Sequence, residues 1–146
     1  MGDVTMIAHR RLVCQTWARL GLTAYCYRFN TMPYGSPDYR GAGHFQEVAF
    51  VFNNKDGVGY PPVSDNPFRE QPTSYFELSD KMSQAWIRFV HDGSPGEFWP
   101  RYDGGKGARN YVWDANVTDR GYLEKDSWRS EGIELINSWN SDIFHR

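Results

Sequence analysis

Residues 41–54, with the sequence GAGHFQEVAFVFNN, decide how the rest of the chain is interpreted. The stretch places His44 behind two glycines, with Glu47 three positions later and an apolar run after that. Because glycine lets the backbone adopt conformations that other residues resist, the pattern predicts a turn with the His44 ring free to face a partner. The segment 47–52 is too short for periodicity to separate a strand from a short helix.

The sequence on either side predicts an α/β arrangement of about three helices and two or three short strands. Apolar residues at steps of three and four predict helices over 4–20, 75–91 and about 125–140. In the first helix the stripe is expected to face the core, with Asp3 as N-cap and Gly21 as C-cap; its members are Ile7, Leu12, Val13, Trp17 and Leu20. In the last helix Trp128, Leu135, Ile136 and Trp139 fall on one side.

Short aromatic segments predict strands at 24–29 and 111–113. Only Arg28 interrupts the apolar character of the first, which is typical of a strand covered on both faces in a parallel or mixed sheet. Residues 31–43 are rich in turn formers, and prolines exclude a continuous helix over 53–73. Since so few strands do not make an independently stable sheet, we expect the sheet to be incomplete.

Composition limits the class of protein. The chain has 146 residues, enough for at most one ordinary domain, and a formal net charge of -2. That charge lacks the basic footprint of a nucleic-acid partner, and no window reaches the ~18 apolar residues of a membrane span. The first residues do not form a secretory signal, and localisation stays open. A sequon at Asn116 would matter in a secreted protein.

The cysteines and most of the histidines favour structural roles. Cys14 and Cys26 are too few for a disulfide scaffold and are predicted to be buried free thiols. Three of the four histidines fall within or near helix ends or the C-terminus, where solvated or capping roles are typical; they are His9, His91 and His145. His44 is the candidate for catalysis, because catalytic groups favour loops held by a rigid scaffold.

The sequence contains a candidate catalytic base, His44, but no recognisable nucleophile for it to activate. His44 and Glu47 lack the second histidine of a metalloprotease motif, so we expect no metal and no cofactor. Both cysteines lie in apolar surroundings, where thiols are inert. No serine has glycine at both positions two residues away, as a nucleophile elbow requires. The tryptophans are expected to be core residues, with a sugar-binding face as a minor alternative.

At this point the sequence resembles the type-B carboxylesterases, the cholinesterase and lipase branch of the α/β-hydrolase fold, and most of all their fungal members. The matching segments occur in the family's order and span nearly the whole chain. They are the helix ending at 18–21, the strand 24–30, the histidine block 41–52, the long helix 78–90 with its turn at 92–95, and Trp-Pro-Arg-Tyr-Asp at 99–103. The histidine block and the Trp-Pro-x-Tyr segment are the most specific of these.

The resemblance implies that residues 1–146 are the C-terminal portion of a carboxylesterase domain acting on a small-molecule ester. It assigns His44 as the general base of a Ser-acid-His triad and Glu47 as a group that supports the site. Asp3 and Asp38 precede His44, but neither matches the motif of the triad acid. The family's elbow serine, triad acid and oxyanion loop are expected to precede this segment. The alternative is a truncated product or interaction module without esterase activity.

Overall fold

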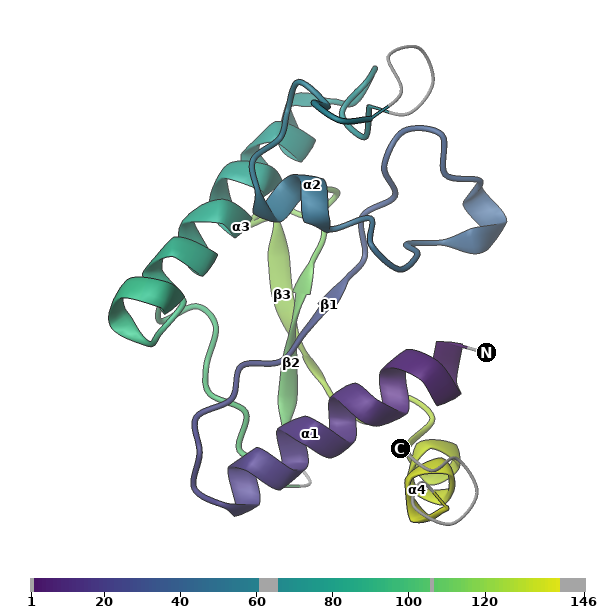
Figure 1. Cartoon of the computed structure of the whole chain (residues 1–146), viewed down its shortest axis with the longest axis vertical. Helices are drawn as coiled ribbons and strands as arrows, with labels where there is room; N and C mark the ends of the chain where they lie inside the picture. The colour runs from purple at the N-terminus through teal and green to yellow at the C-terminus, as the bar shows by residue number, and fades with distance from the viewer. Residues whose placement is uncertain (1, 61–65, 106, 140–146) are drawn as a thin grey trace. The chain divides into compact units, whose positions relative to one another are not determined.

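A computed structural model describes residues 2–60, 66–105 and 107–139, and divides the chain into two compact units. Unit 1 comprises Met1–Cys26, Pro100–Asn110 and Leu123–Arg146, and unit 2 comprises Tyr27–Trp99 and Tyr111–Tyr122. Unit 1 contains a π-helical turn at Asp3–Ile7, α1 (Ala8–Arg19) and α4 (Ser130–Ser138). Unit 2 contains β1 (Tyr27–Phe29), a 3-10 helix at Asp38–Arg40, α2 (Val48–Val51) and α3 (Thr73–Asp92). The strands β2 (Arg109–Trp113) and β3 (Gly121–Lys125) contribute residues to both units (Figure 1).

The three strands form one sheet in the order β1-β2-β3. β1 runs parallel to β2, with Tyr27 opposite Tyr111 and Phe29 opposite Trp113. The parallel pairing agrees with the parallel or mixed sheet predicted for this segment, although the strand is shorter than the predicted 24–29 and its three residues are only partly buried. The segment 47–52, which the pattern left undecided, forms the short helix α2.

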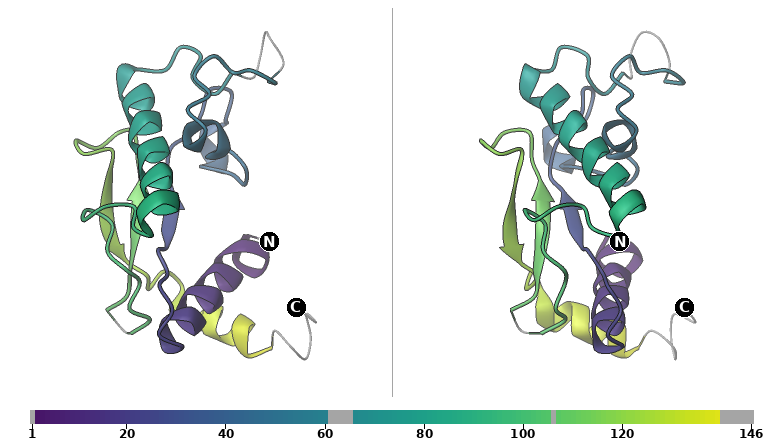
Figure 2. Two further views of the ribbon diagram at one scale, coloured as in Figure 1. Left: turned by 60° about the vertical axis from the view of Figure 1, so that its left-hand side comes forward. Right: turned by 90° about the vertical axis from the view of Figure 1, so that its left-hand side faces the viewer.

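The long helix α3 covers the sheet and matches the prediction for 75–91 closely (Figure 2). Its buried stripe includes Leu78, Met82 and Ala85, at the steps of three and four that predicted the helix, whereas Phe89 at the next such step is exposed. Trp86 adds an aromatic contact, with its ring centroid 5.2 Å from that of Tyr27. The helix ends at Gly93, whose φ of 70° is a left-handed conformation that glycine adopts without strain.

The predicted core face of the first helix is wrong. α1 buries Ala8, Arg11 and Cys14, whereas Trp17 and Leu20 of the predicted stripe are exposed. The helix is oriented by partners that hydrophobicity does not reveal, since Arg11 forms an ion pair and Cys14 a disulfide on that face. The predicted C-terminal end is confirmed, because the Gly21 and Leu22 amides donate to carbonyls of the last turn in the pattern of a glycine cap.

The N-terminal cap and the state of the cysteines also differ from expectation. Asp3 is the first residue of the π-helical turn, not a cap, and its carboxylate pairs with Arg129 at 2.6 Å. Cys14 and Cys26 are joined in a disulfide with a Cα–Cα separation of 6.7 Å, so the prediction of free thiols is wrong. Burial was predicted correctly, because both lie in a small core with Ala24, Tyr102 and Ala108.

The prediction of one helix over about 125–140 is wrong at its N-terminal end. Residues 121–125 form β3, and α4 begins only at Ser130. Ile133 is the residue that α4 buries, so Leu135, two positions later, lies on another face and is half exposed. Trp128 and Trp139 are likewise exposed, contrary to the core role predicted for them. Residue 140 lies outside the described residues.

Candidate functional site

His44 lies on a tight turn at residues 44–47, directly before α2 in unit 2 (Figure 1). Gly41 has a φ of 64°, so the chain enters this region in a conformation that favours glycine. The Gln46 side chain braces the turn, accepting a hydrogen bond from the Gly43 amide at 2.6 Å and donating to the Ser36 hydroxyl. The predicted turn is confirmed.

The short helix α2 fixes the turn to the body of unit 2. Phe50 is fully buried, with its ring 4.5 Å from Phe68 and 5.2 Å from Phe29. The Ser79 hydroxyl of α3 donates to the Phe50 carbonyl at 3.0 Å. A helix of only four residues has little stability of its own, so this packing supplies the order that the turn requires.

The His44 side chain is exposed, and its ring nitrogens are not engaged by protein groups within the described residues. Its neighbour in the turn is Phe45, whose ring centroid lies 6.4 Å away. Phe45 has a φ of 74° and is 62% exposed. A bulky residue in this left-handed region is strained, and such strain is characteristic of functional turns.

Glu47 is tied to the sheet through Tyr27 of β1. The Tyr27 hydroxyl donates a hydrogen bond to the Glu47 carboxylate. Burial, followed by the charge and hydrogen bond of Glu47, raises the pKa of Tyr27 to about 12. Glu47 is thus linked to β1 just before α2 begins, while no hydrogen bond or ion pair joins it to His44 among the described residues.

A cavity of about 300 Å³ opens beside His44. Its walls come from the loops at 33–36 and 44–46 and from two residues of the following irregular segment, Tyr60 and Pro67. Most of these side chains are aromatic or proline. The cavity is of a size that suits a small organic group, and His44 lies in its wall.

Two of the other histidines, His9 and His91, lie in surroundings that match their predicted structural roles. His9 Nδ1 lies 3.3 Å from the carbonyl oxygen of Thr5. His91 is in the last turn of α3, 84% exposed, beside Asp92. His145 lies outside the described residues. Asn116 is exposed in the 114–120 connection, and its backbone N–H donates a hydrogen bond to the Asp114 carboxylate at 2.9 Å, which orders that turn.

Metal-binding side chains and membrane-spanning helices are two further features that the sequence analysis considered. In residues 2–60, 66–105 and 107–139, no three His, Cys, Asp or Glu side chains gather in a metal-binding arrangement. Within the same ranges, none of the helices combines the length and apolar character needed to cross a bilayer.

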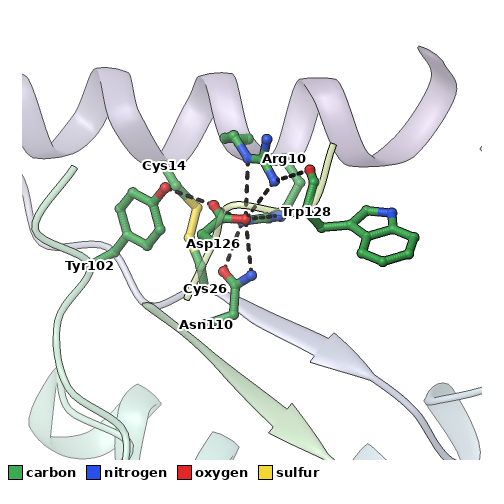
Figure 3. A network of polar contacts seen from close by, with 8 residues as sticks. Arg10, Cys14, Cys26, Tyr102, Asn110, Asp126 and Trp128 are labelled. Carbon is green, nitrogen blue, oxygen red and sulfur yellow. Dashed lines mark hydrogen bonds and ion pairs between the residues drawn. A yellow bond between two sulfur atoms is a disulfide. The ribbon is translucent and has the colours of Figure 1, made fainter. Parts of the chain in front are cut away.

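Sequence reasoning missed a buried ionic network around Asp126 in unit 1 (Figure 3). Its carboxylate accepts hydrogen bonds from the guanidinium groups of Arg10 and Arg11, at 2.6–3.1 Å. The Tyr102 hydroxyl donates at 2.7 Å and the Asn110 amide at 3.1 Å. The acid and the arginines lie more than a hundred positions apart in the sequence, so no local pattern signals the pairing.

The aromatic cluster of unit 2 confirms part of the predicted core. Trp99 and Trp113 are 5% and 0% exposed, with ring centroids 5.5 Å apart. Lys81 of α3 places its ammonium 4.5 Å from the Phe98 ring centroid and donates to the Tyr111 hydroxyl at 2.8 Å. These tryptophans are interior residues and do not form an exposed sugar-binding face.

Comparisons with known proteins place this geometry in context. No protein-family model matches the sequence, and no curated protein matches it significantly. Among solved structures, the Geobacillus stearothermophilus carboxylesterase EST55 is 25% identical with a TM-score of 0.59, covering 82% of this chain and 23% of that one. A PNB esterase is 26% identical with a TM-score of 0.56, covering 79% of this chain and 21% of the other.

A third structure extends the likeness at lower identity. It is an esterase from anaerobic Clostridium hathewayi that can hydrolyse aliphatic aromatic polyesters, 19% identical with a TM-score of 0.60, covering 86% of this chain and 23% of the other. At that identity the likeness shows the fold alone. The chain thus spans less than a quarter of the length of each of these esterases. The predicted α/β class is confirmed, and the structure resembles part of α/β-hydrolase carboxylesterases.

Proposed function

We propose that these 146 residues are the C-terminal portion of a carboxylesterase domain and that His44 is its catalytic base. The observation that carries this proposal is the exposed His44 turn beside a cavity, in a fold similar to EST55 and PNB esterase. More specifically, we propose a type-B carboxylesterase, which is a serine esterase. The substrate is a small-molecule ester.

In this role the His44 imidazole takes the proton of a serine hydroxyl as the oxygen attacks the ester carbonyl. It then returns the proton to the leaving alcohol, and repeats the cycle with water during deacylation. A triad histidine needs one ring nitrogen for the nucleophile and the other for an orienting acid. Since protein groups of the described residues do not engage the His44 ring, both nitrogens are available for those partners.

The proposal places the nucleophile and the triad acid outside these 146 residues, which contain no Gly-x-Ser-x-Gly elbow. Exposed apolar side chains of α1 support a larger domain. Val13, Trp17 and Leu20 are 46%, 47% and 69% exposed. A stripe of this kind on one helix is typical of a surface that another part of a protein covers.

Glu47 is proposed as a positioning residue. Its carboxylate accepts the hydrogen bond of the Tyr27 hydroxyl, on a half-buried side chain, and so links the end of the turn to β1. A glutamine at this position retains an oxygen that accepts from Tyr27 but loses the charge. We therefore expect Glu47→Gln to reduce turnover less than a change of His44 does.

The test is ester hydrolysis by the longest open reading frame that contains these residues, with p-nitrophenyl butyrate as substrate. An in-frame Gly-x-Ser-x-Gly encoded ahead of residue 1 supports the proposal at the outset. His44→Gln is expected to lower kcat by at least about 10³-fold, as loss of a triad member does. His91→Gln, a change of an exposed histidine outside the site, serves as the matched control and is expected to retain full activity.

The 146-residue chain expressed by itself is expected to show no ester turnover that an organophosphate abolishes. Such turnover would contradict the placement of the serine outside this segment. Full activity of the His44→Gln variant in the longer polypeptide would contradict the assignment of the base. Absence of any elbow serine and of any esterase activity would favour the alternative, a non-catalytic interaction module.

A further inference from the structure

The cavity beside His44 has a lining in which apolar surface predominates over polar surface. Its aromatic and proline side chains are Pro33, Tyr34, Phe45, Tyr60 and Pro67. Among the described residues that line it there is no Asp, Glu, Lys or Arg. The Arg69 guanidinium lies over the Tyr34 ring, 5.1 Å from its centroid, and is not one of the lining residues. Because no charged side chain lines the cavity itself, its composition favours uncharged groups over charged ones.

The polar side chains of the cavity are largely occupied within the protein. Gln46 accepts from the Gly43 amide with its oxygen and donates to Ser36 with its nitrogen. That pairing removes the two groups best suited to bind a polar ligand. The remaining polar groups among the described lining residues are the His44 imidazole and the hydroxyls of Tyr34 and Tyr60, each carried on an aromatic ring.

Phe45 is placed in this wall at a cost to the fold. Its φ of 74° puts a bulky side chain in a backbone region where glycine is the unstrained residue. Its ring is 62% exposed, so it recovers little of the burial free energy that usually justifies a phenylalanine. The conformation directs the ring into the wall of the cavity next to His44.

We propose that this cavity binds an uncharged aromatic group of the substrate and that Phe45 is the specificity-determining residue that contacts it. The inference rests on the proposed esterase function for the identity of the substrate as an ester. The binding itself needs only the cavity. Aromatic rings pack on one another in edge-to-face or offset geometry, and a strained, exposed Phe45 supplies such a surface.

The test measures binding to the full 146-residue chain by ligand-observed NMR titration. The probes are benzylacetone, a neutral aromatic ketone that cannot be hydrolysed, and phenylbutyrate, its anionic counterpart of similar size. Benzylacetone is expected to bind more tightly than phenylbutyrate. Phe45→Gly is expected to raise the Kd of benzylacetone by about three- to tenfold, the range of one aromatic pair.

The matched control is Phe52→Gly, the same change at a phenylalanine that is 77% exposed and lies outside the cavity wall. It is expected to leave the Kd of benzylacetone unchanged. Phe45→Gly is also expected to keep or raise the thermal midpoint, since glycine adopts the positive φ without strain. A retained midpoint shows that weaker binding does not arise from misfolding.

The proposal is overturned if Phe45→Gly and wild type bind benzylacetone equally, or if phenylbutyrate binds as tightly as benzylacetone. The two proposals fail separately. Binding of benzylacetone with wild-type activity in the His44→Gln enzyme would refute the catalytic base and leave the pocket intact. Esterase activity that depends on His44, without benzylacetone binding that depends on Phe45, would refute the pocket and leave the base intact.

Discussion

Replacement of Asp126 by asparagine tests whether one buried carboxylate holds unit 1 together. The Asp126 side chain is 2% exposed, as is Arg11, whereas Arg10 is 28% exposed. Asparagine keeps the shape but removes the charge, and leaves the Arg11 guanidinium buried without a counter-ion. Since loss of one partner of a buried ion pair costs about 3–5 kcal/mol, we expect the free energy of unfolding to fall by that amount at neutral pH.

The same pairing sets a dependence on acid. Burial by itself would raise the pKa of Asp126, but the hydrogen bonds and charge of Arg10, followed by those from Arg11 and Tyr102, outweigh it and hold the pKa well below the usual 3.8. An acid with a lowered pKa in the folded state contributes stability above its unfolded pKa and loses it as pH falls toward the folded value. The difference between wild type and Asp126→Asn should therefore shrink below about pH 4.

Two measurements are made, urea unfolding and hydrogen exchange of the α1 amides. Both are needed because a chain of two units need not unfold in one step. Asp56→Asn, a change of an exposed aspartate in unit 2, is the matched control and should alter stability by less than about 0.5 kcal/mol. An Asp126→Asn protein within about 1 kcal/mol of wild type at pH 7 would refute the reasoning, since loss of one partner of a buried ion pair costs about 3–5 kcal/mol. Unchanged protection of α1 amides would do the same.

Four further predictions concern stability. Replacing both Cys14 and Cys26 by serine should cost about 3 kcal/mol in urea unfolding and abolish the effect of a reductant, because the disulfide closes a short loop with a sequence separation of 12. Gly121→Ala should lower the free energy of unfolding by about 1–3 kcal/mol in urea unfolding, since its Cβ would lie 2.5 Å from the Tyr111 ring. Lys81→Met should cost about 1–2 kcal/mol in the same assay through its lost hydrogen bonds. Burial, followed by the charge of Asp119, raises the pKa of Tyr111 to about 12. The contribution of neutral Tyr111 to the free energy of unfolding is therefore complete below pH 10.0 and is lost as the pH rises toward 12. Tyrosinate absorbance during alkaline unfolding should show this loss.

The sequence predicts those parts of the fold whose information is local. The buried stripe of α3 and the glycine that follows it define the helix to within two residues at its N-terminal end and one at its C-terminal end. The two glycines before His44 likewise predict its turn. In both cases the residues that determine the conformation lie within a few positions of it.

Features that depend on distant partners were not predictable in this way. Because Arg11 is charged, the sequence places it on an exposed face of the helix. Its pairing with Asp126 is what makes that face the buried one. The spacing of Cys14 and Cys26 carries no signal of a disulfide. β3 also escaped prediction, because only Gly121 of its five residues is buried and it lacks the apolar alternation of a half-covered strand.

The candidate site combines a strained residue with a short helix, and the two depend on each other. A bulky side chain in the left-handed region costs about 1–2 kcal/mol, which an isolated turn would relieve by changing conformation. Phe50 prevents that change, because its buried ring and the hydrogen bond from Ser79 hold α2 in place behind the turn. The position of His44 is therefore set by the packing of Phe50 more than by contacts of its own ring. That arrangement holds the backbone of the turn in place and leaves the His44 ring nitrogens unoccupied within the described part of the chain. The proposed role of a general base that receives its nucleophile from another segment requires both properties.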